Sequence, residues 1–451
     1  MSLAFPASPT VGDTYTVGAR TWTWSGTIWE ITGTVAAAGS IGTTELADSA
    51  ITSAKIAAGA VAEADIADGA VTTAKIAAGA VVEADIASNA VTSGKLGTDV
   101  QLGYRNVIIN GAMQVAQRGT STASITTAGY YTADRFRLGL SSLGTWTQSV
   151  EADAPTGSGF RNSLKVLCTT ANASPATSDN ATIAHRLEGQ NLQQFLKGTA
   201  SAKSFALSFW VKSNVTGTFI ANLVDSDNTR SVSASYTISA SATWEKKTIV
   251  FPADTTGAFD NDNNESFSCI FFLGVGSTFT SGTLNTTWES LTNANRAVGQ
   301  TNLAAATSNY WQITGVQLEA GAVATPFEFE NFGTTLAKCQ RYYEKTYNIG
   351  TNPATATQLG MVGNDITASA NHSNYIIARF PYKVTKRTAP TITTYDASGN
   401  AGKAMAFNVG AAGTDNFTVT ADFVGEHSFR AYLLGISSAG FTIHYTASAE
   451  L

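Results

Sequence analysis

Alternating hydrophobic and polar positions mark two long stretches of the chain and predict a mainly β protein. Between Tyr104 and Phe332 the expected strands are SLKVLCTT from Ser163, SFALSFWVKS from Ser204, GTFIANLVD from Gly217, SVSASYTIS from Ser231, WEKKTIVF from Trp244, SFSCIFFLGV from Ser266 and YWQITGVQLE from Tyr310. Gly, Asn, Asp, Ser and Thr loops separate them, and only LEGQNLQQFL near Leu187 looks helical. This pattern predicts a jelly-roll sandwich over residues 104–332.

A second, smaller β-sandwich is predicted over residues 333–451. A short helix from Thr334 is expected first, with a threonine cap and with Leu336, Cys339 and Tyr343 on one side. The strands expected after it are NYIIARFPYKV from Asn374, PTITTY from Pro390, AMAFNV from Ala404, NFTVTADFV from Asn416, HSFRAYLL from His427 and GFTIHYTA from Gly440. At the other end of the chain, residues 1–39 contain a predicted three-stranded meander from Thr14 to Thr32, which needs something else to pack against.

Residues 40–103 repeat with a ten-residue period. The copies are ITSAKIAAGA from Ile51, VAEADIADGA from Val61, VTTAKIAAGA from Val71, VVEADIASNA from Val81 and VTSGKLGTDV from Val91. In each copy a β-branched residue is followed five positions later by Ile or Leu. Because this spacing fits neither an amphipathic helix nor a strand, each copy is expected to form a bend and a short turn.

One chain cannot bury this single file of aliphatic side chains, because the flanking Ala and Gly provide no second layer. Burial of each isoleucine against a partner contributes about 1.5 to 3 kcal/mol. We therefore predict a trimeric stalk whose core consists of Ile51, Ile56, Val61, Ile66, Val71, Ile76, Val81, Ile86, Val91 and Leu96. A flexible Ala/Gly/Thr linker is the alternative, although linkers do not need apolar residues at a fixed spacing.

Composition and charge exclude several classes of protein. The 27 Lys+Arg and 33 Asp+Glu give a net charge of −6, which argues against nucleic acid as the main partner. No apolar run approaches the roughly 18 to 20 residues that span a bilayer, so membrane insertion is not expected. The three cysteines, Cys168, Cys269 and Cys339, lack paired spacing and are expected to be reduced and buried.

Motifs of catalytic chemistry are missing from the sequence. It contains no nucleotide-binding or zinc-protease signature, and its four histidines are scattered. Glycan cleavage would need two carboxyl groups at a set separation, and nothing marks such a pair. We therefore expect no enzyme. Asp134 and Arg135, beside Phe136, are interpreted as a buried structural ion pair.

The segment AFDNDNNESF is a candidate cation site. It places Asp260, Asp262 and Asn264 at alternate positions with Glu265 behind them. Oxygen ligands at this spacing on a loop can hold a structural Ca²⁺. The alternative is a turn whose side chains cap their own backbone.

Aromatic side chains in the β regions are the candidate sugar-binding residues, because a flat ring stacks on the apolar face of a sugar. The candidates are Trp288 in a Thr/Asn/Ser-rich loop and Tyr395, Tyr432 and Tyr445 in the last domain. For each of them a place in the core or between subunits is the alternative. Trp210, Trp244 and Trp311 fall on expected strands and are interpreted as core.

Several motifs resemble tail fibre and related structural proteins of tailed phages. They are the opening AFPASPTVGDTYTVGARTWTWSGTIWE, the GAVTTAKIA-type decapeptides, NVIINGAMQVAQRG with YYTADRF, ITGVQLEAGAVATPFEF and CQRYYEKTY. The opening is most similar to that of short-tailed, T7-like marine cyanophages, and the middle domain resembles jelly-roll carbohydrate-binding modules. The resemblance implies an elongated homotrimeric fibre with its N-terminus on the virion and its C-terminus toward the host.

These observations together predict a fibre that attaches a virion to a host cell. Residues 1–39 would contact the phage tail or other virion proteins, and residues 40–103 would form the stalk. The jelly roll and the domain at 333–451, as receptor-binding tip, would bind host surface polysaccharide. The protein would be made in the host cytoplasm. The alternatives are a compact tailspike that cleaves glycan and a capsid or tail decoration protein without a receptor.

Overall fold

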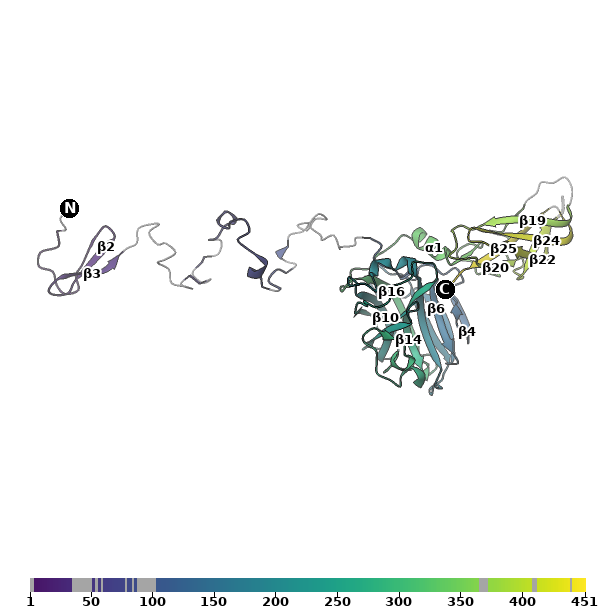
Figure 1. The fold of residues 1–451 in the computed structure, drawn as a ribbon, viewed down its shortest axis with the longest axis horizontal. Helices are drawn as coiled ribbons and strands as arrows, with labels where there is room; N and C mark the ends of the chain where they lie inside the picture. Colours follow the sequence, from purple (N-terminus) through teal and green to yellow (C-terminus); the bar gives the residue numbers. More distant parts are fainter. Residues whose placement is uncertain are drawn as a thin grey trace. The chain divides into compact units, whose positions relative to one another are not determined.

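The computed structural model describes residues 4–34, 51–52, 56–57, 60–77, 79–82, 85–86, 103–364, 372–407, 412–438 and 440–451. The chain divides into two units, Met1–Val100 and Gln101–Leu451 (Figure 1). Strands dominate, and the described residues contain one α-helix, so the expected mainly β class is confirmed. Within the described ranges, no helix is long and apolar enough to span a membrane.

The predicted N-terminal meander is confirmed. Its strands β1 (Thr14–Val17), β2 (Arg20–Trp24) and β3 (Trp29–Thr34) pair in chain order. The sequence left open what covers this small sheet. Phe5 lies on it, with its ring stacked 5.2 Å from that of Trp29 and edge-on to Trp22 at 5.6 Å. This aromatic contact buries Trp22.

In the described residues of the repeat region, short turns recur at the spacing of the sequence. The 3₁₀ turns Glu63–Asp65 and Thr73–Lys75 lie ten residues apart. The Asp65 carboxylate accepts a hydrogen bond from the Ala62 amide at 2.8 Å, which closes the first turn. A second turn follows at Ala67, whose carbonyl accepts from the Ala70 amide, with Gly69 in the left-handed conformation (φ 74°). The expected bend and short turn are therefore confirmed for these copies.

The predicted stalk-core side chains are exposed in the single chain. Ile51, Ile56, Val61, Ile66, Val71, Ile76, Val81 and Ile86 are 43% to 55% exposed. Val91 and Leu96 lie outside the described residues. A regular file of uncovered aliphatic side chains is what the trimer prediction requires, and the trimer itself stays a prediction.

The two-sheet sandwich predicted over residues 104–332 is present, with its strands between Ser121 and Ala320. One sheet has the order β13 (Glu245–Phe251), β10 (Phe205–Ser213), β16 (Tyr310–Ala320), β8 (Ser163–Thr170), β7 (Thr145–Glu151) and β4 (Ser121–Ile125). The other has the order β15 (Glu289–Ser290), β12 (Arg230–Ile238), β11 (Gly217–Asp225), β14 (Glu265–Val275), β9 (Asn180–Glu188), β6 (Phe136–Ser141) and β5 (Gly129–Tyr130). We call the first the six-stranded sheet and the second the seven-stranded sheet.

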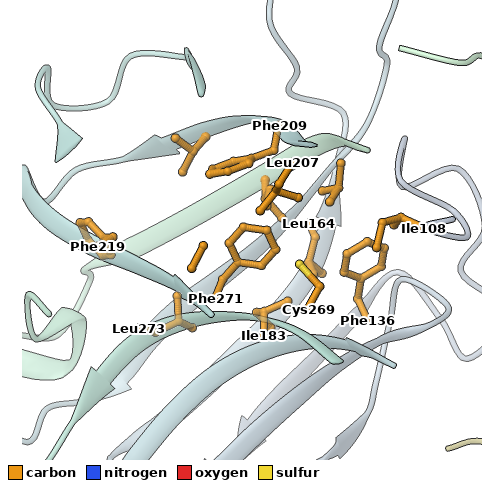
Figure 2. Close-up of a cluster of buried hydrophobic side chains, with 14 of the residues drawn as sticks. Ile108, Phe136, Leu164, Ile183, Leu207, Phe209, Phe219, Cys269, Phe271 and Leu273 are labelled. Carbon is orange, nitrogen blue, oxygen red and sulfur yellow. The ribbon is translucent and has the colours of Figure 1, made fainter. Parts of the chain in front are cut away.

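Side chains from both sheets meet in one hydrophobic core, as Figure 2 shows. Phe209 of β10 contacts Phe271 of β14 edge-on at 5.0 Å between ring centroids. Cys168 and Cys269 belong to this core, and Cys339 is buried elsewhere, so the expected burial of all three thiols is confirmed. Trp311 is buried as expected, whereas Trp210 and Trp244 are half-buried, so the core interpretation was wrong for those two.

The segment expected to be helical near Leu187 is not an α-helix. Leu187 lies in β9, and the chain then forms two 3₁₀ turns, Gly189–Asn191 and Gln193–Phe195. Further 3₁₀ turns are Ser277–Phe279, Asn293–Asn295 and Leu303–Ala305. Apolar residues of the segment, Leu192 and Phe195, point into the sandwich core, which explains their helix-like spacing.

Gly189 permits a close backbone approach at the first of these turns. A Cβ atom at this position would lie 1.9 Å from the Asp260 carbonyl oxygen and 2.4 Å from the Ser266 hydroxyl. We expect Gly189→Ala to lower the free energy of unfolding by about 1 to 3 kcal/mol, because the backbone must move apart. Urea unfolding measures this loss. Gly350→Ala is the control, since its Cβ would enter open space, and an equal loss in both variants would contradict the prediction.

The last domain is also a pair of packed sheets. Around the central β25 (Gly440–Ser448) lie β17 (Tyr343–Lys345), β18 (Val362–Asn364), β20 (Thr391–Tyr395) and β21 (Lys403–Phe407), with β22 (Thr414–Thr418) beside β21. A three-stranded sheet has the order β19 (His372–Pro381), β24 (Ser428–Ser438) and β23 (Thr420–Asp422). Buried residues of both sheets form one core.

The helix before this domain differs from the prediction at both ends. It spans Phe332–Gln340 (α1), and its cap is Asn331, whose side chain accepts a hydrogen bond from the Thr334 amide at 2.9 Å. Tyr343 lies beyond the helix, in β17. Asn is as good a helix cap as Thr. Because the cap is Asn331, the helix begins at Phe332, two residues before the predicted start at Thr334.

Asp134 and Arg135 are both buried, but they do not pair with each other. Arg135 pairs with Glu450 at the chain end, and its guanidinium lies 3.5 Å from the ring centroid of Tyr342. Asp134 accepts hydrogen bonds from Gln117 at 2.6 and 2.9 Å instead. The predicted structural role is therefore correct and the predicted pairing is wrong. The Arg135 contact joins the sandwich to the last domain.

Candidate functional site

The outer face of the six-stranded sheet carries a row of polar side chains. Ser149, Lys165, Gln312 and Lys212 lie opposite one another on the adjacent strands β7, β8, β16 and β10. Side chains alternate between the two faces of a strand. The neighbouring row, Val150, Leu164, Ile313 and Val211, packs on the core, so the polar row faces outward.

Two aromatic rings accompany the two lysines of this row. The Lys165 ammonium lies 4.9 Å from the ring centroid of Tyr310, and the Lys212 ammonium lies 5.8 Å from that of Trp244. Both rings are half-buried. Each pair combines a cation with an aromatic face, an arrangement that holds the flexible lysine in place.

Asp153, in the loop after β7, fixes one end of the row. Its carboxylate accepts from Lys212 Nζ at 2.8 Å, from Trp244 Nε1 at 3.1 Å and from Gln312 Nε2 at 3.2 Å. Burial raises the pKa of this carboxyl group, but the three hydrogen bonds lower the pKa by more, so it stays below its ordinary value. The loop thereby covers Gln312, whereas Lys165, farther along the row, is half-buried.

A hollow of about 290 Å³ lies beside Lys165 and Ser149, and we call it the sheet groove. Its lining residues are Thr120, Ser121, Thr147, Ser149, Val150, Glu151, Lys165 and Leu167. The Glu151 carboxylate accepts a hydrogen bond from the Ser149 hydroxyl at 2.6 Å. Tyr310 lies directly opposite Leu167 on β16, so its ring borders the groove.

The chemistry of the sheet groove suits a ligand with many hydroxyl groups. Hydroxyl side chains, a carboxylate acceptor, an ammonium donor and the apolar Leu167 line it, and the Tyr310 ring lies on the neighbouring strand opposite Leu167. Sugars need this combination of hydrogen-bonding groups and a ring. The sequence did not single out Lys165, Glu151 or Tyr310, because only strand pairing brings them together.

Two of the four predicted aromatic residues lie in the core. Trp288 is buried, and its Nε1 donates to the Pro252 carbonyl at 2.8 Å. Tyr445 is buried in the last domain, where its hydroxyl donates to Glu344 at 2.9 Å. Neither ring faces solvent, so the core alternative holds for both and the sugar-binding expectation is corrected.

The other two, Tyr395 and Tyr432, are half-buried on separate sheets of the last domain. The Tyr395 ring lies 6.0 Å from that of Tyr347. The Tyr432 ring lies 5.4 Å from the guanidinium carbon of Arg430, on the face of the three-stranded sheet. The structure therefore does not gather the four predicted aromatic residues into one site.

The candidate cation ligands hydrogen-bond to other protein groups, and Asp262 and Asn264 do so within their own turn. The Asp262 carboxylate accepts from the amide of Asn264 at 2.9 Å and from its side-chain nitrogen at 2.5 Å. Asp260 contributes its carbonyl oxygen to Gln193 Nε2 at 3.3 Å. Over the described ranges, no group of three or more His, Cys, Asp or Glu residues is placed to hold a metal ion. The Asp262 contact with the Asn264 amide is the one that the backbone-capping alternative describes.

Comparisons with known proteins give structural similarities only at low identity. No family model and no curated protein matches the chain. The enzymatically active domain of bacteriophage CBA120 tailspike protein 4 matches at 15% identity and a TM-score of 0.26, over 48% of this chain and 22% of that one.

Two carbohydrate-binding modules match as well. TmCBM61, solved with β-1,4-galactotriose, is 10% identical with a TM-score of 0.25, over 48% of this chain and 99% of its own. The family 11 module of Clostridium thermocellum, solved with a mixed-linked tetrasaccharide, is 13% identical with a TM-score of 0.25, over 46% and 99%. This chain spans about a fifth of the tailspike (22%), and similarities at this level carry no functional argument.

Proposed function

We propose that this protein is a homotrimeric receptor-binding fibre of a tailed-phage virion, which attaches the particle to host-surface glycan without cleaving it. The N-terminal meander docks on tail or other virion proteins, and the decapeptides form the stalk. The sandwich and the last domain face the cell. The resemblance of the opening, the decapeptides and the domain junctions to phage fibre proteins supports the virion assignment.

The sheet groove is the observation that carries the glycan-binding part of this proposal. It places Lys165 and Glu151 in one hollow of the six-stranded sheet, and Tyr310 lies opposite the lining residue Leu167 on the neighbouring strand. A single site of this size and openness binds weakly. Three copies per fibre raise the effective concentration, so that weak contacts add up to firm attachment.

Competition for adsorption tests the proposal. Soluble trimer added to host cells should block adsorption of the phage, since it occupies the same glycan. Absence of competition would favour a decoration protein without a receptor. Incubation with host envelope polysaccharide provides the second measurement, because new reducing ends would show a glycan-cleaving tailspike and overturn the non-enzymatic assignment.

Removal of groove side chains should weaken binding to purified envelope polysaccharide. We expect Lys165→Ala and Tyr310→Ala each to raise the dissociation constant about tenfold, which corresponds to a loss of about 1.4 kcal/mol. Calorimetric titration measures the change. Lys246→Ala is the matched control, because Lys246 is exposed on β13 and does not line the groove. Wild-type affinity in both groove variants would contradict the site.

A further inference from the structure

The outer face of the three-stranded sheet holds a second arrangement of aromatic and charged side chains, which we call the arginine platform. It consists of Arg379 on β19, Arg430 and Tyr432 on β24, and Asp422 and Phe423 at the end of β23. Arg379, Arg430 and Asp422 lie opposite one another in one cross-strand row. The core residues Ala431 and Phe429 flank Arg430 along its strand, so this row faces away from the core.

Phe423 is held in a position that exposes its ring. The side chain is 70% exposed, and the backbone has φ 44°, a left-handed conformation that non-glycine residues rarely adopt. The guanidinium carbon of Arg430 lies 4.2 Å from the Phe423 ring centroid. Arg430 therefore supports one face of the ring and leaves the other face toward solvent.

Arg430 is itself fixed by a two-point ion pair. Its Nε and Nη2 donate to the two carboxylate oxygens of Asp422 at 2.7 and 2.5 Å. Such bidentate geometry sets the plane of the guanidinium group and, with it, the plane of the stacked Phe423 ring. The platform is thus rigid although it lies at the surface.

The cross-strand row carries an excess of positive charge. Arg379 lies directly opposite Arg430, and like charges in this position disfavour strand pairing. Asp422 neutralises Arg430 through the ion pair. Within the described ranges, Arg379 forms no ion pair of its own, and its side chain is exposed. Arg379 is therefore an exposed cation on β19, one strand away from Arg430 and the Phe423 ring that Arg430 contacts.

We infer that the arginine platform binds an acidic sugar residue of a surface polysaccharide. The apolar face of the sugar ring stacks on Phe423, and the acidic group of the sugar pairs with Arg379. An exposed ring alone would accept neutral and acidic sugars equally, and the exposed Arg379, in a row of two arginines and one aspartate, selects the acidic ones. The inference extends the proposed glycan binding to a second site and does not depend on the sheet groove.

Binding of the full-length protein to defined polysaccharides tests this inference. The probes are polygalacturonate for carboxylates, dextran sulfate for sulfates and unmodified dextran as the neutral polymer. Affinity for one or both acidic probes should exceed that for dextran, and it should fall with added salt. Phe423→Ala and Arg379→Gln should each weaken acidic-probe binding about three- to tenfold, the range typical of one ring or charge contact.

A charge-matched control separates the platform from general electrostatic attraction. Lys403→Gln removes one positive charge from β21 of the other sheet and should leave the affinity unchanged. Equal loss in Lys403→Gln and Arg379→Gln, unchanged affinity in both platform variants, or equal binding of dextran and the acidic probes would each overturn the inference. Thermal unfolding of each variant verifies that the last domain remains folded.

Glycan binding at the sheet groove and at the arginine platform can be tested independently. The same titrations with the double variant Lys165→Ala/Tyr310→Ala show whether binding of the acidic probes persists without the sheet groove. Persistence supports the platform even if the groove does not bind the envelope polysaccharide. Complete loss of acidic-probe binding in that variant assigns it to the groove and overturns the platform.

Discussion

Replacing Ile66 and Ile76 together by aspartate is expected to convert the trimer into single chains or loosely associated ones. Both side chains are exposed in the single chain and would form part of the stalk core in the trimer. Each substitution removes about 1.5 to 3 kcal/mol of apolar burial and places a carboxylate in an apolar setting. Native mass spectrometry of the wild type and the variant measures the change directly.

A conservative variant controls for local effects on the turns. Ile66→Val with Ile76→Val keeps the branched aliphatic side chains and should keep the trimer. The sandwich and the last domain should remain folded in the aspartate variant, because they belong to a separate unit of the chain. A wild-type mass equal to that of one chain, or an intact trimer of the aspartate variant, would refute the stalk.

The second large effect is expected from Glu344→Ala in the last domain. The Glu344 carboxylate accepts from Lys386 Nζ at 2.5 Å and from the Tyr445 hydroxyl at 2.9 Å. Both members of the ion pair are fully buried. Burial lowers the pKa of Lys386, and Glu344 raises it. The variant loses this compensation, and the free energy of unfolding should fall by about 3 to 5 kcal/mol in urea titrations.

Two further variants show whether the loss of stability in Glu344→Ala comes from the buried Lys386 ammonium that it leaves unpaired. Lys386→Met with Glu344→Leu removes both charges and should recover part of the stability, since apolar pairs often replace buried ion pairs without cost. The recovery is incomplete because the Tyr445 hydroxyl loses its acceptor. Lys338→Ala breaks the half-exposed pair with Glu330 and should change stability by less than about 1 kcal/mol. Equal destabilisation by Lys338→Ala and Glu344→Ala would count against the explanation.

Local sequence patterns were sufficient to predict the bounds of a strand where one of its faces is buried. The strand at Ser163–Thr170 matches its predicted bounds because alternation along it reports the inner and outer faces. The segment near Leu187 shows where this reasoning fails. Leu192 and Phe195 reach the core from successive 3₁₀ turns, and their spacing resembles that of one helix face.

Residues of the candidate binding sites were harder to predict from the sequence than strands. Aromatic type and a loop setting singled out Trp288, but its indole fills the core and donates to Pro252. Phe423 lies inside the strand predicted from Asn416, whereas in the structure it follows β23. Its exposure results from a left-handed backbone and from the Arg430 side chain against its ring, which the sequence does not show. Burial of a ring depends on what the rest of the chain places over it.

The sequence alone determined the mainly β class, the ten-residue repeat with its file of aliphatic side chains, the N-terminal meander and the two later β regions. These features depend on residues close together in the chain, and the sequence itself shows the periodic spacing of their hydrophobic and polar side chains. Only the tertiary structure decided that Ser149, Lys165, Gln312 and Lys212 form one row, and that Arg135 pairs with Glu450. Such pairs join residues far apart in sequence, and the order of the strands within each sheet, set by packing of the whole core, brings them together.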